Sequence, residues 1–146
     1  MKPLIYLASP YSHASSVVRE DRYNEALQCT QWLVENRFLV FSPIVHSHHV
    51  GQKISGKVDP KYGWGYWKEF DTEMITRCDE IWILVIPGVL ESVGVKAEIK
   101  INDLQGKKCY LIWGYDYDNY KNVRLDFIES FESKIKEILN AQAYRL

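Results

Sequence analysis

Hydrophobic residues form two kinds of pattern along this chain. Short unbroken runs predict strands of a parallel sheet that is buried on both faces; they lie at residues 4–9, 38–42, 80–86 and 108–113. Apolar residues that recur every three or four positions predict amphipathic helices; these stretches lie at residues 16–36, 64–78, 91–104 and 123–140. The alternation indicates an α/β fold, a three-layer sandwich of the flavodoxin or Rossmann type, with a mostly parallel sheet of four to five strands flanked by helices. The length suits a single domain, residues 1–146.

Two stretches, residues 43–64 and 114–120, show neither pattern and are expected to be loops. A loop as long as 43–64 inside a compact domain is more often functional than idle, so we expect it to cover a pocket as a lid. Its histidines His46, His48 and His49 are too loosely spaced for a structural zinc site. His46 follows the second strand and is the best placed of them to touch a substrate.

Charge and cysteine usage narrow the class of partner. The formal net charge of -1 gives no general attraction to nucleic acid polymers or to membranes. The three cysteines are odd in number and lie in apolar surroundings, which favours reduced thiols in the cytoplasm. The first apolar stretch is too short for a signal peptide or a membrane span. We therefore expect a cytoplasmic protein that acts on a small molecule without a cofactor or metal.

The expected place for a ligand follows from the fold class. Open parallel sheets bind ligands at the carboxyl ends of their strands, near the point where the strand order reverses. In this chain the loops after Ser9, Ser42 and Ile86 carry polar residues and proline at those ends. The site is expected among these loops.

The third helix carries a glutamate beside its apolar face. Its expected apolar stripe consists of Val93, Ala97, Ile101 and Leu104. Glu98 would lie at the edge of that stripe and lean over Gly94, which has no side chain to block a small molecule. Ser92 is a good N-cap, and the free N–H groups of the first turn suit a phosphate. The alternative is that Ser92 only caps, Gly94 only permits close packing and Glu98 is solvated.

The second helix carries a carboxylate within its apolar face. Asp71 is four residues from both Trp67 and Ile75. Burial raises the pKa of a carboxyl, as a general acid near neutral pH requires; the alternative is an aspartate that hydrogen-bonds a neighbouring loop. Two carboxylates on helices that flank one central strand suit glycosidic chemistry, in which one attacks the anomeric carbon and the other protonates the leaving group.

Four segments, in this order and spacing, resemble the nucleoside 2-deoxyribosyltransferase superfamily: YLASPYSH at 6–13, FSPIVHSH at 41–48, DTEMITRCDEIWIL at 71–84 and SVGVKAE at 92–98. The resemblance extends over residues 4–113 and is strongest toward small bacterial and phage members of uncharacterised function. The chain is also similar to the 2'-deoxynucleoside 5'-monophosphate N-hydrolases. The resemblance implies that Glu98 is the nucleophile of a covalent 2-deoxyribosyl-enzyme, that Asp71 protonates the base, and that Tyr6 orients the nucleophile.

The resemblance also implies how a substrate would be held. Ser92 and Gly94 match a turn that contacts phosphate, and Ser9 falls in a loop that closes around sugar and phosphate. From the residues themselves, Arg19 and Arg22 could supply positive charge for an anion at the start of the first helix. The alternative for these arginines is solvated pairing with acidic neighbours on the same helix, Glu20, Asp21 or Glu25.

The sequence therefore predicts an enzyme that cleaves the N-glycosidic bond of a 2'-deoxynucleoside or its 5'-monophosphate. Water as acceptor makes it a hydrolase, and a second base makes it a transferase. Trp64 is expected to stack on the base, because aromatic faces suit planar ligands. The resemblance implies a homo-oligomer, a dimer or higher. The alternatives are a non-catalytic nucleotide-sensing module that uses the same pocket, and an enzyme acting on NAD or another ribosyl compound.

Overall fold

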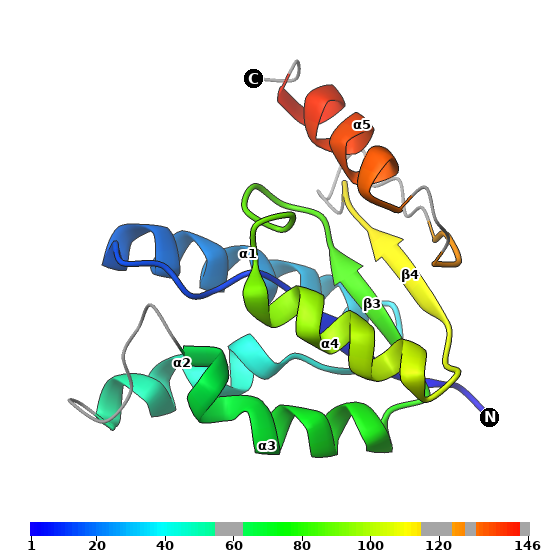
Figure 1. The fold of residues 1–146 in the computed structure, drawn as a ribbon, viewed down its shortest axis with the longest axis horizontal. Coiled ribbons are helices and arrows are strands. Elements are labelled where there is room, and N and C mark those ends of the chain that lie inside the picture. The colour runs from blue at the N-terminus through cyan, green and yellow to red at the C-terminus, as the bar shows by residue number, and fades with distance from the viewer. Residues whose placement is uncertain (55–62, 115–123, 128–130, 144–146) are drawn as a thin grey trace.

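The computed structural model describes residues 1–54, 63–114, 124–127 and 131–143. One four-stranded, all-parallel sheet is formed by β1 (Leu4–Ala8), β2 (Leu39–Phe41), β3 (Glu80–Leu84) and β4 (Cys109–Ile112). The helices are α1 (Ser16–Glu35), α2 (Pro43–Lys53), α3 (Gly63–Arg77), α4 (Val93–Leu104) and α5 (Phe131–Ala143). The predicted α/β class and parallel sheet are confirmed (Figure 1).

Both faces of the sheet are covered, because side chains alternate along each strand. Ile5 and Leu7 of β1 pack with Cys29 of α1 on one face. Tyr6 and Ala8 point to the other face, which is covered by α3, α4 and α5. In Figure 1, α4 lies in front of the strands, α3 lies below α4, and α1 lies behind the strands. The structure is thus a three-layer sandwich.

The order of the strands across the sheet is β2-β1-β3-β4. The side on which the chain adds its next strand therefore changes between β1 and β3. The chain steps outward from β1 to β2 on one side and from β3 to β4 on the other. Tyr6 is paired with Phe41 of β2 and with Ile81 of β3, so β1 is central at this level. A ligand is expected in the crevice beyond the carboxyl ends of β1 and β3.

The prediction of a loop over residues 43–64 is wrong for its first half. Pro43–Lys53 is the helix α2, and residues 55–62 lie outside the described part of the chain. The helix begins at a capped start: the Ser42 hydroxyl accepts the N–H of Val45 at 3.2 Å, and Pro43 occupies the first turn. Serine followed by proline suits an N-cap and an N1 position, since proline has no N–H to leave unbonded there.

The predicted apolar stripe of α4 is wrong at its two ends, whereas Ile101 within it packs against the core. Val93 and Leu104 are 72% and 77% exposed. The buried side of the helix instead carries Val95, Glu98, Ile99 and Asn102. Glu98 therefore lies inside the buried face and not at its edge, and it is not solvated.

The C-terminal helix begins later than predicted. Residues 124–127 are not helical, and α5 begins at Phe131. Its buried residues Ile135 and Ile138 are two of the apolar positions that predicted the helix. The loop expected at 114–120 lies outside the described residues from 115 onward. Within the described part of the chain, no helix is long and apolar enough to cross a membrane.

Candidate active site

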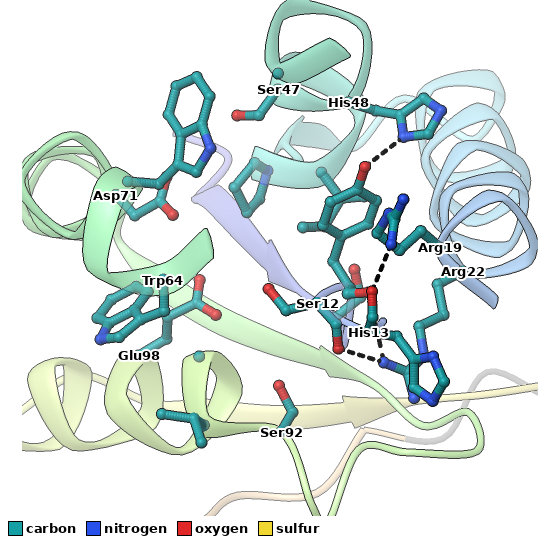
Figure 2. A pocket seen from close by; sticks show the side chains of 18 of the residues that line it. Ser12, His13, Arg19, Arg22, Ser47, His48, Trp64, Asp71, Ser92 and Glu98 are labelled. Carbon is teal, nitrogen blue, oxygen red and sulfur yellow. Dashed lines mark hydrogen bonds between the residues drawn. The ribbon is translucent and has the colours of Figure 1, made fainter. Parts of the chain in front are cut away.

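A cavity of about 980 Å³ opens at the reversal point of the strand order. Its wall is formed by the segments that follow β1 and β3 and by α1, α2, α3 and α4. The volume lies at the upper end of the range typical of small-molecule sites. In Figure 2 the labelled residues come from opposite sides of this cavity, with Asp71 and Glu98 on one side and Arg19 and Arg22 on the other.

Glu98 lines this cavity from α4 and is only 4% exposed. The hydroxyl of Tyr6, on β1, donates a hydrogen bond to Glu98 Oε2. Burial raises the pKa of Glu98 to about 8; the Tyr6 hydrogen bond lowers this pKa, and the charge of Asp71 raises it. Burial also raises the pKa of Tyr6 well above its usual range, so that Tyr6 remains a donor.

Asp71 faces the same cavity from α3 and is 7% exposed. Ile75 and Cys78 on the same side of the helix are buried, as the sequence predicted for this face. Burial raises the pKa of Asp71 to about 7. Its Oδ1 atom is buried and has no hydrogen-bond partner among the residues that the structure describes. A buried polar atom without a partner is uncommon, and one that faces a cavity is suited to bind a ligand group.

The protonation of Asp71 affects Glu98, because the charge of Asp71 raises the pKa of Glu98. Both pKa values are shifted upward, so the pair retains a proton at neutral pH. One protonated and one ionised carboxyl is the state that general acid catalysis with a carboxylate nucleophile requires.

The turn before α4 brings Ser92 and Gly94 beside Glu98. The Ser92 hydroxyl caps the helix by accepting the N–H of Val95 at 3.2 Å. A Cβ built on Gly94 would lie 3.9 Å from Glu98 Oε1 and 3.8 Å from Trp64 Cε3. Glycine therefore leaves open the space over the carboxylate, as the sequence predicted. Trp64 also lines the cavity.

Ser9 directly follows β1 and lines the cavity, with 4% of its surface exposed. Its hydroxyl oxygen is buried, and within the described part of the chain it has no hydrogen-bond partner. Ser9 Oγ and Asp71 Oδ1 are thus two unpartnered polar atoms on one cavity wall.

Arg19 and Arg22 lie on the cavity wall at the start of α1. Arg19 donates to the carbonyls of His13 and Ala14 at 2.6 and 3.0 Å, and Arg22 donates to the carbonyl of Ser12 at 3.0 Å. Among the described residues, neither guanidinium forms an ion pair. The alternative, in which Arg19 and Arg22 pair with acidic neighbours on α1, is therefore not observed among the described residues.

A glycine fixes the position of Arg22. Gly88, after β3, has φ +95°. A Cβ built there would lie 2.2 Å from Arg22 Nη2, so only glycine allows this approach. Burial lowers the pKa of Arg22, and the charge of Glu91 raises it. Glu91 itself lines the exposed rim of the cavity.

His46 does not line the cavity, so its predicted contact with a substrate is wrong. It is exposed and stacks on Phe70, with ring centroids 4.9 Å apart. The cavity wall of α2 is formed by other residues, among them Ser47 and His48. The serine and proline at positions 42 and 43 are the sequence signal that could have predicted these cavity residues. They indicate that a helix begins there, and helical spacing then determines which residues of 43–53 lie on the same face. Among the described residues, no group of His, Cys, Asp and Glu is placed to hold a metal ion.

The fold and the site define a parallel α/β protein with a buried carboxyl pair on the wall of a cavity. The profile of a family described as "Domain of unknown function (DUF1937)" matches residues 3–114, and the chain belongs to this family. All the site residues described above lie within the matched region. No curated protein matches the chain.

Proposed function

We propose that this protein cleaves the N-glycosidic bond of a 2'-deoxynucleoside 5'-monophosphate. The observation that carries the proposal is the buried pair Asp71 and Glu98, which face one cavity from two helices. Tyr6 donates a hydrogen bond to Glu98. The sequence resemblance to the nucleoside 2-deoxyribosyltransferase superfamily assigns roles to the same three residues. The geometry and the resemblance therefore support one reaction.

In the proposed reaction, an ionised Glu98 oxygen attacks C1' of the sugar. The bond from C1' to the base nitrogen breaks, its electron pair stays on the base, and Asp71 donates the proton that neutralises the base. Water then attacks C1' of the glycosyl-enzyme, Asp71 takes the water's proton, and the Glu98 carboxylate leaves. Without a 2'-hydroxyl to withdraw electrons, the oxocarbenium-like transition state forms more readily, so a carboxylate suffices as nucleophile. A second base in place of water would make the reaction a transfer.

The proton of the pair has to be on Asp71 when attack begins. In the free protein the proton favours Glu98, whose pKa is raised to about 8, chiefly by burial and with the Tyr6 hydrogen bond already included, against about 7 for Asp71. Positive charge that develops on the sugar beside Glu98 as the bond to the base breaks opposes this preference, because it stabilises the Glu98 carboxylate. The approach to the transition state thus favours the ionised nucleophile.

The opposite side of the cavity suits the 5'-phosphate. Arg19 and Arg22 lie there, and neither forms an ion pair with a carboxylate of the part of the chain that the structure describes. The N-terminus of α4, with Ser92 at its cap, opens onto the same cavity. Cationic side chains together with a helix N-terminus favour a phosphate. This supports a monophosphate over an unphosphorylated nucleoside.

A panel of deoxynucleosides, their 5'-monophosphates and NAD tests the proposal, with free base detected by chromatography. We expect base release from at least one monophosphate, and its loss in Asp71→Asn and Glu98→Gln. Base release that survives in Glu98→Gln would reject the nucleophile and point to another acid. Glu91→Gln is the matched comparison, because Glu91 lies on the rim and we expect its loss to matter much less. Release of nicotinamide from NAD alone would indicate a different ribosyl substrate.

One observation favours a second candidate, a nucleotide-binding module without catalysis. The raised pKa of Glu98 leaves it protonated in the free protein at neutral pH, and a protonated carboxyl donates a hydrogen bond instead of attacking carbon. Glu98 would then orient the sugar. Tight binding of one nucleotide without base release from any would establish the module and reject the enzyme. For either candidate we propose a cytoplasmic location and a homo-oligomeric assembly; the three free, buried cysteines suit the former.

A further inference from the structure

A group of hydrogen bonds joins the C-terminal ends of α3 and α4 and has no part in the proposed reaction. Asp71 lies on α3 and Glu98 on α4, and both side chains line the cavity. The two helices pack against each other, and in Figure 1 they run in the same direction, so that both end near the starts of β3 and β4. The connecting contacts lie at these helix ends, outside the cavity.

Lys107, in the turn between α4 and β4, closes the end of α3. Its Nζ atom donates to the carbonyl oxygens of Ile75, Thr76 and Cys78, at 2.8, 2.9 and 2.7 Å. The last carbonyls of a helix have no partner within the helix, and a lysine ammonium has three donors to offer them. A cation at this end also interacts favourably with the helix dipole. Ile75 is one helical turn after Asp71, so Lys107 fixes α3 close to this carboxyl.

Asn102 holds the same turn from α4. It is 1% exposed, and its side-chain nitrogen donates to the carbonyls of Lys107 and Lys108 at 3.1 and 3.2 Å. Its backbone carbonyl accepts the N–H of Lys107 at 3.2 Å. Asn102 is one helical turn after Glu98. Lys107 is therefore held by α4 one turn beyond Glu98, while its side chain holds α3 one turn beyond Asp71.

A third side chain connects the same helix ends. Gln105 Nε2 donates to Thr76 Oγ1 at 2.9 Å. Thr76 Oγ1 in turn donates to the carbonyl of Thr72 at 2.9 Å, and Thr72 is the neighbour of Asp71 in the chain. We call Asn102, Gln105 and Lys107 the brace, because together they tie α3 to α4.

The separation of two carboxyls determines which glycosidic chemistry they support. A nucleophile and its acid partner lie about 5–5.5 Å apart in enzymes that form a covalent intermediate, and a wider spacing of about 6.5–9.5 Å leaves room for direct attack by water. Tyr6 fixes Glu98 from the sheet. Asp71 Oδ1 has no hydrogen-bond partner among the described residues, so the position of Asp71 depends on where α3 lies.

We propose that Asn102, Gln105 and Lys107 are positioning residues, which fix α3 against α4 and thereby set the separation of the two carboxyls. The brace acts one helical turn away from each carboxyl and touches neither. The use of that separation in catalysis rests on the proposed function, whereas the effect of the brace on Asp71 does not.

The first test is the titration of the Asp71 carboxyl in the free protein, followed by carbon-13 NMR and assigned with Asp71→Asn. Lys107→Met keeps a side chain of similar length but removes its donors, so α3 should loosen and water should reach Asp71. Burial raises the pKa of Asp71 to about 7, so the midpoint should fall by about one pH unit or more toward the ordinary value of about 4. Loss of the positive charge alone would act in the opposite direction, because a cation lowers the pKa of a nearby carboxyl. The sign of the shift therefore separates positioning from direct electrostatics.

Three further variants sharpen this titration. Lys107→Arg retains the charge and the donors and should keep the wild-type midpoint. Lys2→Met is the matched control and should also keep it, since Lys2 donates to the carbonyl of Arg37 at 2.7 Å and does not line the cavity. Gln105→Leu removes one bond between two exposed side chains, so the fold is retained, and the midpoint should fall by a smaller amount. A midpoint that stays or rises in Lys107→Met would overturn the proposal; if that variant does not fold, an unchanged midpoint in Gln105→Leu has the same force.

The second test is base release from a 2'-deoxynucleoside 5'-monophosphate. Misplacement of a reacting group by about 1 Å can lower a rate by on the order of 100-fold, so kcat should fall roughly 10-fold to 100-fold in Lys107→Met and recover in Lys107→Arg. KM should change little, because none of the three residues of the brace lines the cavity. A wild-type kcat in a variant whose Asp71 midpoint has fallen would contradict the catalytic use of the brace. If no substrate releases its base, the proposed function fails while the titration still decides the role of the brace, so the two failures are distinguishable.

Discussion

The hydroxyl of Tyr6 donates a hydrogen bond to the buried carboxyl of Glu98, across a separation of 92 residues in the chain. Tyr6 lies on the central strand β1 and Glu98 on α4, which packs over the sheet. The contact supplies the one favourable influence on the ionised form of Glu98 among the effects that set its pKa. The orientation and the charge of the candidate nucleophile thus depend on the sheet itself.

Tyr6→Phe tests that dependence. The ring and its packing against Phe41 are retained, but the donor is lost, so the pKa of Glu98 should rise further. At a given pH less Glu98 is ionised, and the acid limb of the kcat/KM profile should move to higher pH. We expect kcat/KM near neutral pH to fall roughly 10-fold to 100-fold, the effect of one hydrogen bond to a charged group. A profile that keeps its position would show that Tyr6 only packs.

The carboxyl pair should make the protein less stable as the pH rises. Asp71 and Glu98 have folded-state pKa values of about 7 and about 8, against ordinary values of about 4. Between these limits the folded state holds more protons than the unfolded state, so the free energy of unfolding falls with increasing pH. Urea unfolding at pH 5 and pH 8 should show a smaller fall in Asp71→Asn than in the wild type. The exposed Asp103→Asn should leave the fall unchanged, and an equal fall in all three proteins would contradict the burial of charge at Asp71.

Gly94→Ala separates stability from activity. The added methyl meets Glu98 Oε1 and Ser92 Oγ at 3.9 Å and Trp64 Cε3 at 3.8 Å, which is ordinary contact, so the fold should tolerate it. Alanine in place of glycine within a helix should add about 0.5–1 kcal/mol of stability. The same methyl fills the space over the carboxylate, so base release should fall. Gly65→Ala, whose Cβ meets nothing within 4 Å, should give a similar gain in stability with a smaller loss of activity.

Gly88→Ala and Arg22→Gln should weaken the same interaction by different routes. The first displaces the Arg22 guanidinium, because the new Cβ would lie 2.2 Å from Nη2, and the second removes its charge. Both should raise KM for the monophosphate by about tenfold, the effect of one charge-assisted contact, and leave KM for the nucleoside unchanged. Arg77→Gln, which removes an exposed arginine paired with Glu73, serves as the control. Equal effects on nucleoside and monophosphate would place the phosphate elsewhere.

Much of the fold was predictable because its signals are local. Buried strands of a parallel sheet form unbroken apolar runs, and the position of Asp71 among apolar neighbours follows from helical spacing alone. The cap at Ser92 could be predicted for the same reason. That Asp71 and Ser92 line the same cavity could not be predicted in this way, because the cavity depends on which strands are adjacent in the sheet.

The buried face of α4 was mispredicted because half of it is polar. Asn102 is buried since its side chain donates to the carbonyls of Lys107 and Lys108, at 3.1 and 3.2 Å, and so holds the turn before β4. Glu98 is buried because it faces the cavity. A hydrophobic pattern counts neither residue, so it selects the exposed Val93 and Leu104 instead. The same reliance on apolar spacing missed α2, which carries histidines, serine and glycine behind a serine cap.

The most direct test of the central claim is intact-protein mass spectrometry after rapid acid quenching of wild-type protein mixed with a 2'-deoxynucleoside 5'-monophosphate that releases its base. The account predicts a mass increase equal to one deoxyribose phosphate, located on the peptide that contains Glu98 and absent from Glu98→Gln. It also predicts that base release in that variant falls by a factor of about 10⁴ or more. Base release by the wild type with the adduct on another residue, or with turnover undiminished in Glu98→Gln, would contradict the account.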